Sequence, residues 1–122
     1  MYYELEVNAE EGYVRATATC DITRVIATQM TDGVFQMLRA ENLEAGLIDV
    51  RNCRNVDAPS QNYQFANEDA AALKLRTTDR IAILAAPDDD SHDFVAIVMG
   101  NNGYNVHIFR DEEEALAWLK IT

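Results

Sequence analysis

The stretch GYNVHIFRDEEEALAWL, residues 103–119, places a strand directly before a helix. The apolar run NVHIF, residues 105–109, predicts a short buried strand, and Gly103 closes the helix before it. Asp111, followed by Glu114 three residues later, is a capping-box variant that predicts a helix from Asp111 toward Lys120. Its first turn is acidic, as the helix dipole favours. The acidic run therefore indicates a helix start rather than a site.

Two further apolar runs lie upstream, AGLIDV at residues 45–50 and RIAILAA at residues 80–86. Short continuous apolar runs are typical of strands buried on both faces of a parallel sheet. Between the three runs, the pattern predicts one helix in the region 67–75 and another from about 91 to 101. Such alternation of strands and helices is typical of an α/β fold.

The N-terminal part has a different pattern, with apolar residues at every second position on both sides of the loop 9–12. Period two on two adjacent arms predicts an antiparallel hairpin. From Ile22 to Leu38 the apolar spacing becomes helical, and Asp21 or Thr23 can cap that helix. The sequence thus predicts one domain over residues 1–122, with a mixed, mostly parallel sheet, an N-terminal β-hairpin and the order β-β-α-β-α-β-α-β-α.

The composition limits the classes of function. The chain has 122 residues, and 21 Asp and Glu against 10 Lys and Arg give a formal net charge of −11. Such a charge opposes binding to nucleic acid and to anionic membrane surfaces. No apolar run reaches membrane-spanning length, and the N-terminus lacks a signal-peptide pattern, so we expect a cytoplasmic protein. Cys20 and Cys53 form no metal-binding pattern, and we expect reduced thiols and no cofactor.

The ending quoted above resembles that of the small SpoIIAA-like proteins, a bacterial group also described as STAS/SEC14-like. Gly103, the strand Val106–Phe109, Asp111, the acidic turn and the segment 115–119 carry the resemblance, and the element order extends it over nearly the whole chain. The resemblance implies a mixed sheet covered by helices, usually without catalysis. In the antagonist branch it also implies a serine at the helix start after the third strand, whose phosphorylation controls binding to a partner kinase.

This chain departs from that branch at the proposed switch. The aspartate of the third strand corresponds to Asp49, but the loop RNCRNVDAPSQN replaces the tight serine-containing helix start. Ser60 is the one serine in this loop and lies eleven residues after Asp49. The resemblance therefore does not carry the phosphorylation switch over to this sequence.

The best place to look for a site is the edge where the parallel strands end, because open α/β folds bind ligands there. The candidate ligand- or partner-binding residues at this edge are Asp49, Arg51, Asn52, Arg54, Asn55, Ser60 and His92. We assign no metal site, although Asp88, Asp89 and Asp90 together with His92 offer ligands for Mg²⁺. The alternative for that run is a solvated loop in which Asp90 or Ser91 caps a helix.

Two functional hypotheses remain open from the sequence. The first is a non-catalytic binding or regulatory module, not an enzyme, that acts through an unidentified protein partner or as a homodimer. Tyr2 and Tyr3 on the first strand would give such a dimer an aromatic surface. The second is a small metal-dependent enzyme or a ligand-binding site at the carboxyl edge of the sheet.

A last expectation concerns the apolar core. A lipid site needs a cavity of a few hundred Å³, and a domain of this size can spare little of its core. We therefore expect a filled core without a tightly bound lipid. The large apolar residues that could line a cavity are Ile26, Met30, Phe35, Met37, Phe65, Phe94 and Trp118.

Overall fold

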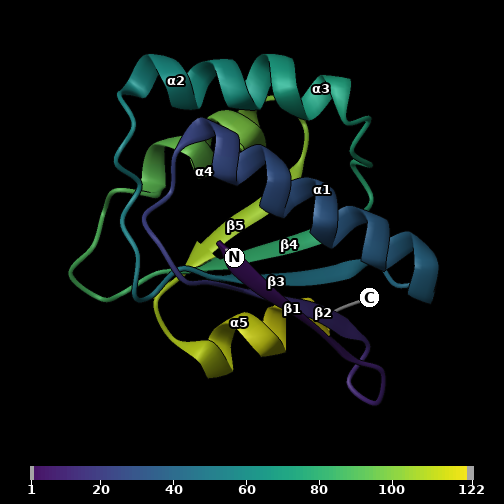
Figure 1. Ribbon diagram of the computed structural model, residues 1–122. Coiled ribbons are helices and arrows are strands. Elements are labelled where there is room, and N and C mark those ends of the chain that lie inside the picture. The colour runs from purple at the N-terminus through teal and green to yellow at the C-terminus, as the bar shows by residue number, and fades with distance from the viewer. Residues whose placement is uncertain (1, 121–122) are drawn as a thin grey trace.

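The computed structural model describes residues 2–120 and contains a five-stranded sheet. The strands are β1 (Tyr3–Asn8), β2 (Tyr13–Ala18), β3 (Ala45–Asp49), β4 (Arg80–Leu84) and β5 (Asn105–Phe109). They lie in sequence order across the sheet, with β1 antiparallel to β2 and all other pairs parallel (Figure 1). The predicted mixed sheet and N-terminal hairpin are confirmed.

Helical elements cover both faces of the sheet. They are α1 (Arg24–Glu41), α2 (Pro59–Gln64), the π-helix η1 (Phe65–Asp69), α3 (Ala70–Ala72), α4 (Asp93–Asn101) and α5 (Glu112–Leu119). Figure 1 shows α5 on one face and α1 and α4 on the other, with the run α2–η1–α3 lying over α1 and α4. We call this run the 59–72 segment. No helix within residues 2–120 is long and apolar enough to cross a membrane.

The 59–72 segment begins earlier than the sequence predicts. The predicted region started at residue 67, whereas the structure starts the helix at Pro59. Proline suits the first helical position, because its fixed φ fits the helix and no amide donor is needed there. The first turns bury no residue, so they lack the apolar stripe on which the prediction depended. At the other end, Lys74 adopts a left-handed conformation with φ of 57°.

The caps expected for the first and last helices are present, whereas the cap expected for α4 from Asp90 or Ser91 is wrong: His92 is the N-cap residue of α4 and its side chain makes no cap hydrogen bond. Thr23 caps α1 by accepting a hydrogen bond from the amide of Ile26 at 3.4 Å, and α1 ends at Asn42 in a left-handed conformation. Asp111 accepts from the amide of Glu114 at 3.2 Å, as the capping-box interpretation requires. The acidic run of the opening stretch therefore starts α5.

Each face of the sheet has its own apolar core. On the α1 face, Val14, Val34 and Leu38 are completely buried. On the α5 face, the core residues are Tyr13, Ala45, Leu47, Ala82, Leu84, Ala115 and Leu119. Trp118 packs at the edge of this second core, against Phe109 and His107. The one tryptophan of the chain thus lies on the face away from α1 and α4.

Candidate functional site

The carboxyl edge of the sheet carries a network that we call the arginine–carboxylate cluster, made of Arg15, Asp49, Arg51 and Glu112. Arg15 Nη2 lies 2.7 Å from Asp49 Oδ2 and 2.9 Å from Glu112 Oε1. Arg51 Nη2 contacts the same two carboxylates at 2.8 and 3.0 Å. Asp49 also accepts the backbone amide of Arg51 at 3.1 Å. The two arginines and two carboxylates therefore neutralise one another.

Electrostatics keeps both carboxylates of this cluster ionised. Burial alone would raise the pKa of Asp49, but its hydrogen bonds from Arg51 and Arg15 hold that pKa below its ordinary value. The hydrogen bond from Arg15 lowers the pKa of Glu112 in the same way. A general acid or base would need a pKa shifted toward neutral pH, which neither group has. Both carboxylates are therefore held as anions between the two arginines.

A second group, the His92 cluster, lies on the α4 side of the same edge. His92 is buried, and its Nε2 lies 2.9 Å from the carbonyl oxygen of Cys53 and 3.4 Å from Asp89 Oδ2. Asp89 is also buried, and it contacts Arg54 Nη1 at 3.3 Å and accepts the amide of Ser91 at 2.8 Å. Burial opposes the charge on Asp89, but hydrogen bonds from Ser91 and the nearby His92 and Arg54 leave its pKa lowered.

The remaining residues predicted for this edge do not join a single site. Asn52 and Ser60 are exposed, and Ser60 is the second residue of α2. Asn55 donates from its side chain to Asn62 Oδ1 at 2.7 Å and from its amide to Ser91 Oγ at 2.9 Å.

The acidic run 88–90 is divided. Asp88 and Asp90 point to solvent, whereas Asp89 is buried. Within residues 2–120, no three His, Cys, Asp or Glu side chains are placed to hold a metal ion together.

Cys53 is a buried thiol whose backbone carbonyl contacts His92. Burial raises the pKa of its thiol, and its Sγ lies 3.4 Å from the carbonyl oxygen of Ala18. A reactive cysteine needs a lowered pKa and access to solvent. Cys53 has neither, so the neighbouring arginines in the sequence do not activate it.

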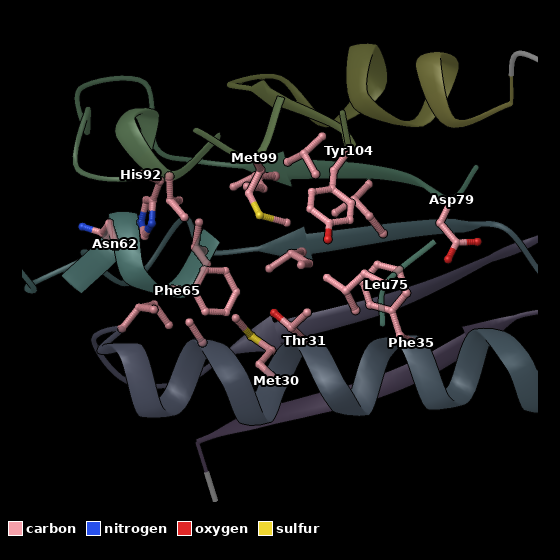
Figure 2. Close-up of a pocket in the computed structure, with 18 of the residues that line it drawn as sticks. Met30, Thr31, Phe35, Asn62, Phe65, Leu75, Asp79, His92, Met99 and Tyr104 are labelled. Carbon is pink, nitrogen blue, oxygen red and sulfur yellow. The ribbon is translucent and has the colours of Figure 1, made fainter. Parts of the chain in front are cut away.

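An apolar pocket lies between the sheet and the helices of the α1 face (Figure 2). We call it the helix-side pocket. Met30 from α1, Phe65 from η1 and Met99 from α4 point into it from three different elements. The 59–72 segment closes its top, and the sheet residues Ile48, Ile81, Ile83 and Val106 form its floor.

The volume of the helix-side pocket is about 80 Å³. This is below the few hundred Å³ that a lipid site needs, although the 59–72 segment rests on α1 and α4 and leaves some space above the strands. The apolar residues named as possible cavity lining divide between the pocket and other places. Met30, Phe35 and Phe65 line the pocket, whereas Phe94 is 40% exposed and Trp118 lies on the opposite face.

The two ends of the pocket are polar and already paired. His92, Asn55 and Asn62 lie at the carboxyl edge. At the amino edge, the buried carboxylate of Asp79 receives two hydrogen bonds from Arg39, at 2.6 and 3.0 Å. Within the described chain, no buried side-chain nitrogen or oxygen lacks a hydrogen-bond partner. The buried polar groups of the pocket wall are thus satisfied within the protein, while the exposed Arg76 also belongs to the lining.

Polar contacts fasten the 59–72 segment over the pocket. Arg24 of α1 binds both carboxylate oxygens of Asp69, at 2.7 and 3.0 Å, and Gln64 at 2.7 Å. On the other side, Asn102 donates to the carbonyl of Ala66 at 3.1 Å and to Asn67 Oδ1 at 2.8 Å. The segment also buries Phe65, Ala66 and Ala70 against Val98 and Met99 of α4.

Sequence reasoning missed three participants. Arg15 and Glu112 lie 34 and 63 residues from Asp49 in the sequence, so no short-range pattern predicts that they belong to the same cluster. The sequence features that could have indicated them are an arginine on the polar face of β2 and an acidic first helical turn after β5. Asp79 was not predicted, because it directly precedes a strand, whereas the predicted site lies where the parallel strands end.

Comparison with known proteins supports the fold. No protein-family model matches the chain, and no curated protein was found to match it. Among solved structures, it is similar to an uncharacterized protein from the DUF3478 family with a SpoIIAA-like fold, from Shewanella loihica PV-4. The two share 20% sequence identity over 96% of this chain and 91% of the other, with a TM-score of 0.57. The SpoIIAA-like fold expected from the C-terminal resemblance is confirmed.

Proposed function

We propose that this chain is a non-catalytic binding module that takes a small, uncharged apolar molecule into the helix-side pocket. The observation that carries the proposal is the pocket itself, an apolar space in the interior of a small domain. Protein interiors are close-packed, so an unfilled apolar space is costly to keep. A ligand that fills it would recover the missing contacts.

The wall chemistry supports an adaptable site. Met30 and Met99 are flexible and polarizable, and methionine is common where a surface must fit irregular shapes. Phe65, which also lines the pocket, begins a π-helix, and π-helical turns occur frequently at functional sites. The buried groups His92 and Asp79 at the two ends are paired with protein atoms, and the rest of the lining is mostly apolar apart from the exposed Arg76, which favours an apolar ligand.

The size of the pocket limits the ligand. An engineered apolar cavity of about 150 Å³ binds benzene, and this pocket is smaller. A benzene-sized molecule would need a small expansion, and an acyl chain would need the 59–72 segment to move. The prediction that no lipid binds tightly is therefore retained. A cytoplasmic location and a regulatory protein partner also remain part of the proposal.

The test compares ligand binding by the wild-type chain and by Met30→Trp, which fills the pocket. Benzene should raise the midpoint of thermal unfolding of the wild-type chain in a saturable way. Met30→Trp should abolish the effect. Leu116→Trp, on the α5 face, is the matched control and should leave it intact. The proposal fails if benzene does not stabilise the wild-type chain, or if Met30→Trp is stabilised equally.

A further inference from the structure

The first strand forms a free edge of the sheet. β1 pairs with β2 on one side and has no strand on its other side within residues 2–120. Figure 1 shows β1 at the front of the sheet, between α1 above and α5 below, with neither helix covering its outer edge. A free edge presents backbone donors and acceptors that can pair with another strand.

The register identifies which backbone groups are free. The amide of Thr19 donates to the carbonyl of Tyr2 at 2.9 Å, so Tyr2 and Thr19 are a hydrogen-bonded pair. Hydrogen-bonded and non-hydrogen-bonded pairs alternate along an antiparallel ladder. Tyr3, Leu5 and Val7 therefore direct their backbone N–H and C=O groups away from β2, toward the open edge.

The two faces beside this edge differ in chemistry. The side chains of Tyr3, Leu5 and Val7 lie on the α1 face, where Tyr3 and Leu5 pack on the core and Val7 is 37% exposed. Glu4 and Glu6 lie on the other face, exposed, and neither forms an ion pair within the described chain. An added strand would meet an apolar surface on one side and two unpaired carboxylates on the other.

This pattern disfavours a second copy of the chain as the occupant. In an antiparallel pairing of two β1 strands, residues opposite each other lie on the same face. When Leu5 lies opposite Leu5, Glu4 of each copy lies opposite Glu6 of the other copy. A shift of the register in either direction places Glu4 opposite Glu4, or Glu6 opposite Glu6. Like charges directly opposite are destabilising, so the three central registers of self-pairing, centred on Glu4, Leu5 and Glu6, carry a penalty.

We propose that the β1 edge binds an extended segment of a partner protein in which apolar residues alternate with lysine or arginine. Added as a sixth strand, such a segment pairs its backbone with Tyr3, Leu5 and Val7. Its apolar residues cover Val7 and the adjoining α1 face, and its basic residues lie opposite Glu4 and Glu6. The net charge of −11 steers basic partners toward the chain. The expected homodimer would then use a surface other than this edge.

A designed peptide tests the proposal. The probe is acetyl-TVKVKVT-amide, titrated into ¹⁵N-labelled protein, with acetyl-TVEVEVT-amide as the charge-reversed peptide. We expect saturable shifts of the amide signals of Tyr3, Leu5 and Val7 with the lysine peptide. The double variant Glu4→Lys/Glu6→Lys should bind the lysine peptide at least tenfold more weakly and should instead prefer the glutamate peptide.

A second double variant separates strand addition from general charge attraction. Glu113→Lys/Glu114→Lys makes the same change in net charge at exposed positions of α5. It should leave the affinity for the lysine peptide within about threefold of the wild type. The proposal is overturned if millimolar lysine peptide leaves the β1 amides unmoved, or if the α5 variant weakens binding as much as the β1 variant. Circular dichroism confirms that both variants are folded.

Discussion

The two faces of the sheet are covered in different ways. On the α5 face, one short helix packs directly on the strands, and Leu47, Leu84 and Ala115 are completely buried. On the other face, α1 and α4 flank the sheet and the 59–72 segment rests on them, which leaves the helix-side pocket. A helix that docks directly on strands can interlock with them. A segment supported by two other helices is held away from the strands, and space remains beneath it.

The side chains follow this difference. The closed face uses Leu and Ala, which have well-defined shapes, whereas Met30, Met99, Phe35 and Phe65 surround the pocket. Methionine tolerates irregular spaces because its chain is flexible. The 59–72 segment is held by polar contacts from Arg24 and Asn102 as well as by the apolar packing of Phe65. The α5 face is thus packed throughout, whereas the α1 face combines a packed core around Val34 and Leu38 with the helix-side pocket.

The largest expected effect comes from opening the closed face. Leu84→Ala removes a fully buried side chain beneath α5 and should lower the free energy of unfolding by about 2–5 kcal/mol. Met99→Ala, in the pocket wall, should cost no more than the lower end of that range, because flexible neighbours can move into the space. Urea unfolding at pH 7 measures both. Equal losses would show that the two faces are packed alike.

Substitutions that add volume to each face should have a smaller effect on stability, and the effect should differ between the two faces. Ala115→Leu adds volume to the closed face and should destabilise by about 1–3 kcal/mol, since a close-packed core must distort to accept it. Ala27→Leu adds the same volume at the pocket and should cost less than about 1 kcal/mol. Both sites are helical and the substitution is the same, so the difference in helix propensity is small. A larger loss for Ala27→Leu, measured by thermal unfolding, would contradict the comparison.

The sequence predicted the sheet because strand and helix signals are local. The apolar runs 45–50 and 80–86, the hairpin pattern and the cap at Asp111 each depend on neighbouring residues. The candidate residues Asp49, Asn55 and His92 were correctly placed near the carboxyl edge, because strand ends converge there.

What the sequence did not predict depends on distant contacts. The partners of Asp49 come from two other elements, and they become visible only when the strands are aligned. The helix-side pocket is the space left between the sheet and the helices above it, and its volume depends on how far the 59–72 segment lies from the strands. The start of the 59–72 segment at Pro59 was not predicted, because the sequence PSQNYQ is polar and carries no apolar stripe.

The smallest expected effect concerns Glu112, which joins the arginine–carboxylate cluster on the α5 face. Its side chain is 39% exposed, so water screens its contacts with Arg15 and Arg51. Glu112→Gln should therefore lower the free energy of unfolding at pH 7 by less than about 1 kcal/mol. Asp49 keeps both arginines in the variant, which limits the loss further.

The pH dependence of this difference shows whether it is electrostatic. Because Arg15 lowers the pKa of Glu112 in the folded state, the folded chain gives up this proton more readily than the unfolded chain. The stabilisation is therefore fully present above the ordinary carboxyl pKa of about 4, and it is lost as the pH falls through the lower folded value. Urea unfolding of both chains at pH 7 and pH 3 should show the difference shrinking at pH 3. A difference of the same size at both pH values would assign the effect of Glu112 to packing or helix capping. The charge of Glu112 would then contribute nothing to the stability of the closed face.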